Sequence, residues 1–149
     1  MKNKNEEAEN LGTLVQDELA AVETYKQALE KVTGETTMAP ELRRIEAEHE
    51  EALSTLQGHM AQANAEVPTG SGLWGEWAKA VEGTAKMFGA KAAIKALKEG
   101  EEHGVHKYES ALRNQELDEE IRQIIRAQLL PKTKAHIPVL DRLMVQAGK

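Results

Sequence analysis

The sequence predicts an all-α protein, and three observations lead to that prediction. Apolar residues recur every three or four positions along four long segments, turn-forming residues separate these segments, and no stretch alternates apolar and polar residues as a strand does. A chain of 149 residues, 40% of them hydrophobic, is long enough for one domain with its own core. We therefore expect residues 1–149 to form a single up-down four-helix bundle.

The first two helices are expected to form a hairpin over residues 6–63. The first covers about residues 6–33 and ends at Gly34, and the second begins around Thr37 and Pro40 and runs to about residue 63. The apolar positions of the first helix are Leu11, Leu14, Val15, Val22, Tyr25, Leu29 and Val32. Those of the second are Leu42, Ile45, Leu53, Leu56 and Met60.

The second pair of helices is expected to form a hairpin over residues 85–147. Its first helix ends near Asn114 and, after a tight turn, the last helix carries apolar residues from Ile121 to Leu143. Residues 64–84 contain turn-forming residues followed by a segment with Trp74 and Trp77, which predicts a long crossover containing a short helix.

The two hairpins share a repeated pattern. Glu18 and Tyr25 recur as Glu101 and Tyr108 at the same spacing, with matching apolar neighbours. His49 and His136 likewise each precede two leucines. A repeat of this kind predicts one helical hairpin used twice.

The repeated acidic and imidazole residues occupy positions that helical periodicity assigns to the core. Residues four and seven positions from Glu18 lie within about 40° of it on a helix, and all four are apolar or aromatic. Glu101 has equivalent neighbours, and His49 lies between apolar residues with Glu46 on an adjoining edge. His136 also has leucines around it. We expect these five side chains to point inward.

Five inward ionisable groups predict a metal site. A buried carboxylate without a partner costs several kcal/mol, so it needs a proton, a partner or a cation. Carboxylate oxygens and imidazole nitrogens suit iron, manganese or zinc. The alternative is that each group is held by hydrogen bonds, or that Lys98 and Lys132 at the edges of the core neutralise part of the charge.

The pattern resembles the ferritin-like superfamily, above all rubrerythrin-type domains and small bacterial ferritin-like proteins. The likeness rests on one Glu from each of two helices and Glu46-x-x-His49 on a third, and covers nearly the whole chain. It implies a ferritin-like four-helix bundle with a di-iron-type site. Glu18 and Glu101 would be terminal ligands, Glu46 a bridge, and His49 and His136 nitrogen ligands. Tyr25 and Tyr108 would orient the carboxylates.

The fourth helix departs from the family pattern, which requires Glu-x-x-His. Here Thr133 stands in place of the glutamate, three residues before His136, so a bridging carboxylate is missing and Thr133 becomes a neighbour of the site. Pro131 and Pro138 are expected to bend or break this helix. The site could then hold two metal ions with one bridge, a single ion near Glu18, Glu46 and His49, or none.

Composition excludes several function classes. The chain has no cysteine, which rules out disulfides, thiolate metal sites and a rubredoxin-like electron-transfer domain. A net charge of −6 argues against nucleic-acid binding, and no long apolar run predicts a membrane span. The polar N-terminus is no secretory signal, so we expect a cytoplasmic protein.

The resemblance implies a non-haem iron oxidoreductase that oxidises Fe(II) with oxygen or peroxide in defence against oxidative stress. Two other hypotheses stay open: a metal-free helical scaffold or stress-related binding protein, and a ferritin-type storage shell. The tryptophans and the Gly-rich crossover also suggest a homodimer contact. The acidic residues Glu48, Glu50 and Glu51 and the histidines His103 and His106 are expected to face solvent.

Overall fold

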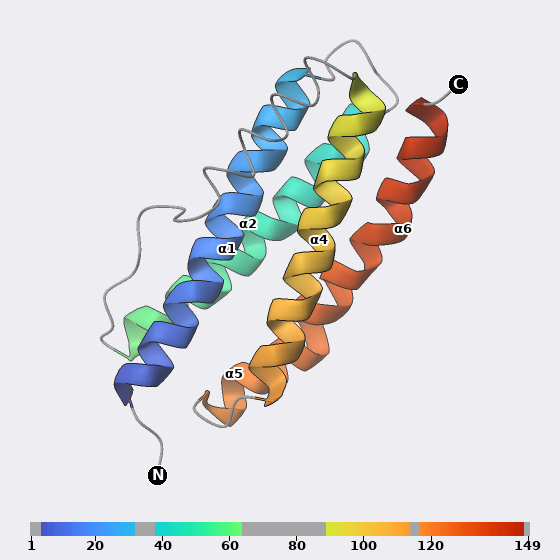
Figure 1. The fold of residues 1–149 in the computed structure, drawn as a ribbon. Helices are drawn as coiled ribbons and strands as arrows, with labels where there is room; N and C mark the ends of the chain where they lie inside the picture. Colours follow the sequence, from blue (N-terminus) through green and yellow to red (C-terminus); the bar gives the residue numbers. More distant parts are fainter. Residues whose placement is uncertain (1–3, 32–37, 64–88, 114–116, 148–149) are drawn as a thin grey trace.

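The computed structural model describes residues 4–31, 38–63, 89–113 and 117–147 (Figure 1). They form α1 (Lys4–Lys31), α2 (Ala39–Gln62), α4 (Ala90–Arg113), α5 (Glu119–Ile124), a π-helical segment η1 (Ile125–Leu129) and α6 (Leu130–Ala147). No strand occurs among these residues, which confirms the all-α prediction. Within the same ranges, no helix is both long and apolar enough to cross a membrane.

The helices pack as two antiparallel pairs. α1 lies against α2 and α4 lies against α6, while α1 also contacts α4. In Figure 1, α2 and α4 run in the same direction, so α2 ends at one end of the bundle and α4 begins at the other. The predicted crossover, with its short helix containing Trp74 and Trp77, falls outside the described residues. So do Gly34 and Thr37, which were expected at the first turn.

The start of α2 shows how the sequence sets a helix boundary. Pro40 occupies the first turn, where its missing N–H has no helical partner to lose, and Glu41 adds a negative charge near the positive end of the helix dipole. The N–H of Leu42 donates to the carbonyl of Met38 at 3.1 Å, and the Met38 side chain is buried. The helix therefore begins with an apolar anchor that packs into the core.

Two apolar layers fill the interior. One contains Leu11, Leu14, Val15, Ala52, Leu56, Met60, Tyr108, Ala111, Leu117, Ile121, Ile125, Leu129 and Leu130. The other contains Tyr25, Ala28, Met38, Leu42, Ile45, Ala93, Ile94, Leu97, Leu140 and Leu143. Glu18 follows Leu14 and Val15 of the first layer and precedes Tyr25 of the second along α1. The repeated polar residues therefore lie at the boundary between the two apolar layers.

The last helix of the bundle differs from the expected broken one. Its first part widens into the π-helical segment η1, where the N–H of Leu130 donates to the carbonyl of Ile125, five residues back. α6 then continues through Pro138, so this proline does not break the helix. Pro138 and Lys134, whose carbonyl loses its helical donor, are both exposed, so water can satisfy that carbonyl.

Candidate metal centre

Four buried ionisable side chains meet in the centre of the bundle, one from each long helix. Glu18 comes from α1, His49 from α2, Glu101 from α4 and His136 from α6, and each is at most 5% exposed. Each side chain was expected inward because apolar residues surround it along its own helix. The structure brings all four together.

His49 bridges the two repeated glutamates. Its Nδ1 lies 2.6 Å from Oε2 of Glu18, and its Nε2 lies 2.6 Å from Oε1 of Glu101. The Tyr25 ring stacks on the His49 ring, with centroids 5.5 Å apart. The imidazole is therefore fixed at both nitrogens and on one face.

His136 contacts one of the same glutamates from the other side. Its Nδ1 lies 3.2 Å from both carboxylate oxygens of Glu101, and its Nε2 lies 3.2 Å from Oε1 of Glu48. The His136 and His49 rings are 4.9 Å apart between centroids. Glu101 therefore lies between two imidazoles, and each imidazole has a second carboxylate on its far nitrogen.

Each tyrosine of the repeat forms a hydrogen bond with the glutamate of the other copy of the repeat. The Tyr25 hydroxyl donates to Oε1 of Glu101 at 2.8 Å, and the Tyr108 hydroxyl donates to Oε1 of Glu18 at 2.5 Å. Burial and the adjacent carboxylates raise the pKa of both tyrosines well above the ordinary value, so both hydroxyls keep their protons. Each tyrosine thus orients the glutamate of the other repeat.

Charges within the cluster compensate one another. Burial lowers the pKa of His49, but attraction to Glu101 and Glu18 outweighs burial and raises this pKa well above the ordinary value. Burial raises the pKa of Glu101, but His49 and His136 outweigh it and lower this pKa to about 2. At neutral pH the metal-free cluster therefore holds an imidazolium between carboxylates.

Three of these residues lie close enough together to hold a metal ion. His49, Glu101 and His136 each offer a ligand atom, and these atoms all lie within 4.8 Å of one another. Two imidazole nitrogens and one carboxylate form a ligand set typical of non-haem iron, with positions left for other ligands. The buried His/Glu/His cluster could therefore hold a metal ion.

Glu46 is not brought into this group, although the Glu46-x-x-His49 spacing suggested it. It is only partly buried, and Lys26 and Glu50 are the charged residues that act on it. Three residues correspond to about 300° of helical rotation, which turns Glu46 about 60° away from His49. Glu46 is therefore not among the residues that converge with His49, Glu101 and His136.

Glu48 takes a place that the sequence did not predict. We expected it on a solvated face with Glu50 and Glu51, and those two residues are indeed exposed. Glu48 is instead part-buried, with Oε1 on His136 and Oε2 bound by the Arg44 guanidinium at 2.8 Å. Periodicity within α2 gives no signal for this contact, because the position of α6 decides it.

Thr133 lies beside the site but donates elsewhere. It is 4% exposed, and its hydroxyl donates to the Leu129 carbonyl at 2.8 Å, at the end of η1. Thr133 thus satisfies a backbone group at the π-helical segment and adds no acidic oxygen to the cluster.

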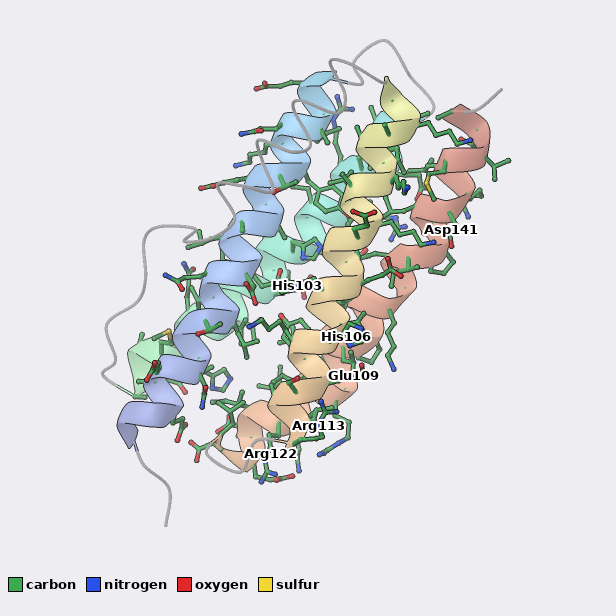
Figure 2. The ribbon with its side chains drawn as sticks, viewed as in Figure 1. His103, His106, Glu109, Arg113, Arg122 and Asp141 are labelled. Atoms are coloured by element: carbon green, nitrogen blue, oxygen red, sulfur yellow. The ribbon has the colours of Figure 1, made fainter. Side chains whose placement is uncertain are left out.

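The two histidines of α4, His103 and His106, are exposed, as expected. Figure 2 shows both on the outward side of α4. His106 has a distant contact with Glu109, with 3.9 Å between nitrogen and oxygen. Neither histidine belongs to the buried cluster.

Comparison with known proteins places the chain in a family. Residues 6–114 match the family described as "Domain of unknown function (DUF2383)". The match includes Glu18, Glu48, His49 and Glu101 and stops before His136. No curated protein and no solved structure matches the chain. Because the match covers well over half of its length, the protein belongs to the DUF2383 family.

Proposed function

We propose that this protein binds one transition-metal ion through His49, His136 and the Glu101 carboxylate. The observation that supports this proposal is the convergence of these three buried groups from three helices. A buried carboxylate between two imidazoles has little structural purpose that apolar residues could not serve more cheaply. A cation gives the arrangement a function.

The distances fit a metal ion with little rearrangement. With metal–ligand bonds of about 2.1 Å, ligand atoms on opposite sides of an ion lie ~4.2 Å apart and adjacent ones ~3.0 Å apart. The ligand atoms of the cluster lie within 4.8 Å of one another, and Nε2 of His49 is 2.6 Å from Glu101. Small side-chain shifts suffice to accommodate an ion.

The contacts also assign roles to the remaining carboxylates. If His49 binds the ion through Nε2, its Nδ1–H donates to Glu18. If His136 binds through Nδ1, its Nε2–H donates to Glu48. A carboxylate on the far nitrogen of a ligating histidine fixes its tautomer and raises its basicity. Glu18 and Glu48 therefore orient ligands in this proposal, rather than Glu18 acting as a terminal ligand.

A single ion suits this cluster better than two. A ferritin-like di-iron site needs bridging carboxylates, but Thr133 replaces one and Glu46 lies away from the cluster. Two nitrogens and one carboxylate favour iron in its ferrous state, while manganese or zinc would use the same ligands.

Bound Fe(II) would supply redox chemistry, as the resemblance to ferritin-like proteins implies. Each ferrous ion gives up one electron, and peroxide takes up two electrons and two protons to become two waters. The bound ferrous ion would supply one of these electrons and a second ferrous ion from solution the other, so that two Fe(II), one peroxide and two protons give two Fe(III) and two waters. Within the protein, Glu101 and the histidines would hold the ion, and the apolar layers would exclude bulk water. We propose this oxidation as a defence against oxidative stress.

A metal-free scaffold is the second candidate, and one observation favours it. Every ionisable group of the cluster already has a hydrogen-bond partner within the cluster or in Glu48. A protein with this network can fold without any ion. The two candidates therefore differ in metal content and not in fold.

Metal analysis tests the proposal. Protein purified without chelator, reconstituted anaerobically with Fe(II) and desalted should retain about one ion per chain if three ligands converge as described. His49→Gln and His136→Gln should each lose most of this metal, because each removes one of only three ligands. Glu101→Gln keeps the shape of the side chain and should lose metal as well.

His106→Gln is the matched control, since it removes an exposed histidine from α4 without touching the cluster. It should bind metal as the unmodified protein does. Circular dichroism shows whether each variant remains folded. Failure of the unmodified protein to retain iron, manganese or zinc would reject the proposal and favour the scaffold.

A further inference from the structure

A cavity lies between α1 and α4, beside the buried cluster. Its volume is about 30 Å³, and Glu18 and Glu101 form part of its lining. Small residues form another part of its wall, namely Ala21 from α1 and Ala96, Gly100 and Gly104 from α4, and Leu14 and Leu97 add larger apolar side chains. These helices contact each other directly, so larger side chains at these positions would fill the space.

The hydroxyl groups of the wall are already engaged. Thr24 donates to the Ala20 carbonyl at 2.7 Å, and Thr133 donates to the Leu129 carbonyl at 2.8 Å. Tyr25 and Tyr108 donate to the glutamates. These four hydroxyl groups already donate hydrogen bonds within the protein. A sugar or other ligand that needs many hydrogen bonds would therefore bind poorly.

Charge disfavours another class of ligand. The carboxylates of Glu18 and Glu101 line the cavity together with the His49 imidazolium that lies between them, so these charges largely compensate one another and give neither an anion nor a cation a strong attraction. Asp17 and Lys107 also line the cavity, but both are partly exposed and of opposite sign, so together they add no net charge. The cavity therefore favours a neutral molecule.

The opposite side of the cluster differs in character. There a space of only about 10 Å³ between α2 and α6 is lined by Glu48, Glu51 and Lys132, among others. Lys132 pairs with Glu51 at 3.5 Å across this side. A small neutral molecule thus meets a roomier cavity with several apolar side chains on the α1–α4 side, and a narrow space with charged side chains on the α2–α6 side.

We propose that the α1–α4 cavity binds a small neutral molecule of the dioxygen or hydrogen peroxide class next to Glu101. A water molecule needs roughly 10–15 Å³ of such space, so the cavity has room for about two heavy atoms. As the place where an oxidant would approach bound metal, the site rests on the proposed function. As a cavity that takes up a neutral diatomic molecule, it does not need the metal.

Dioxygen itself is a suitable probe, because it is paramagnetic and shortens the NMR relaxation times of nearby methyl groups. In metal-free protein under oxygen pressure, the methyl groups of Ala21 and Leu97, which line the cavity, should relax faster than those of Ala28 and Ala93. The latter two are completely buried in the second layer and do not line the cavity, so they report oxygen dissolved in the core generally.

Gly104 allows the cavity to be closed. A β-carbon at Gly104 would lie 3.4 Å from Cγ2 of Thr133, an ordinary van der Waals contact, so Gly104→Ala fits without strain. It should reduce the extra relaxation of Ala21 and Leu97, and Gly104→Leu should abolish it. Gly58→Ala makes the same change on exposed α2, with no atom within 4 Å, and should leave the relaxation unchanged.

The outcomes separate this inference from the proposed function. Equal relaxation of lining and non-lining methyl groups, or no effect of Gly104→Ala in the folded protein, would overturn the cavity as a binding site even if metal binds. Selective relaxation that Gly104→Ala reduces would support it even if the protein retains no metal. If Gly104→Leu does not fold, the methyl relaxation of Gly104→Ala alone decides whether the cavity binds dioxygen.

Discussion

The Tyr25 hydroxyl donates to the Glu101 carboxylate across the bundle, although the two residues come from different copies of the repeat. Tyr108 makes the reciprocal contact with Glu18. The repeated residues are therefore linked, because α1 supplies the hydrogen-bond donor for the buried acid of α4, and α4 supplies the donor for the buried acid of α1. This exchange links the halves at the level where the two histidines meet.

Removal of either hydroxyl should destabilise the metal-free protein. Tyr25→Phe leaves Oε1 of Glu101 without one donor, and Tyr108→Phe does the same to Glu18. A hydrogen bond to a charged group contributes about 1.5–3 kcal/mol, and we expect a loss in that range for each variant. Urea unfolding measures it. Unchanged unfolding midpoints in both variants would show that the hydroxyls do not support the acids.

Glu48 and Glu46 should differ in their effect on metal binding. Glu48→Gln weakens the acceptor on Nε2 of His136 and should lower metal affinity by about 10–100-fold, as loss of such a partner commonly does. Glu46→Gln should leave affinity unchanged, as should Glu50→Gln at an exposed position. Competition with a chelator of known affinity gives the values. Loss of metal in Glu46→Gln alone would instead favour the bridging role of Glu46.

Acid should unfold the metal-free protein partly through Glu101. Its pKa falls from an ordinary 4.5 to about 2 on folding, so this group contributes stability above pH 4.5 that is lost as the pH falls toward 2. The shift corresponds to on the order of 3 kcal/mol, a value shared with its histidine partners. The free energy of unfolding, measured across this pH range, should decline less steeply in Glu101→Gln. Identical slopes in the two proteins would contradict this assignment.

Replacement of Pro138 should stabilise α6. Pro138→Ala restores an N–H that can donate to the Lys134 carbonyl, and proline is less favourable than alanine by about 3 kcal/mol inside a helix. The gain should stay below that limit, because Lys134 is exposed and water can hydrate its carbonyl. Pro40→Ala is the control: in the first turn of α2 it should bring no comparable gain. A lower melting temperature for Pro138→Ala would mean that the proline fits this helix for another reason.

Local sequence was enough to predict the helices and their buried faces. Glu18 and Glu101 were expected inside because residues four and seven positions away are apolar or aromatic, and both are buried. The same reasoning placed His49 and His136 inside. Helical periodicity is a property of one segment at a time, so it can be read before the segments are assembled.

The partners of these groups depend on how the helices pack. The Glu46-x-x-His49 spacing on α2 predicted that Glu46 would join His49. Glu48 contacts the cluster instead, because α6 brings His136 next to it. That α6 continues through Pro138 without a break also depends on packing, since the exposure of Lys134 is set by which face of the helix the bundle leaves open.

The sequence by itself therefore predicted an all-helical chain with three acids and two imidazoles turned inward. Both imidazoles, Glu18 and Glu101 are buried, while Glu46 is only partly buried. Tertiary structure alone decided which nitrogen meets which oxygen, and that a cavity opens beside them between α1 and α4. The physical reason is that burial follows from the periodicity of a single helix. Distances of 2.6–3.2 Å between side chains follow from the relative positions of four helices, which no single segment encodes.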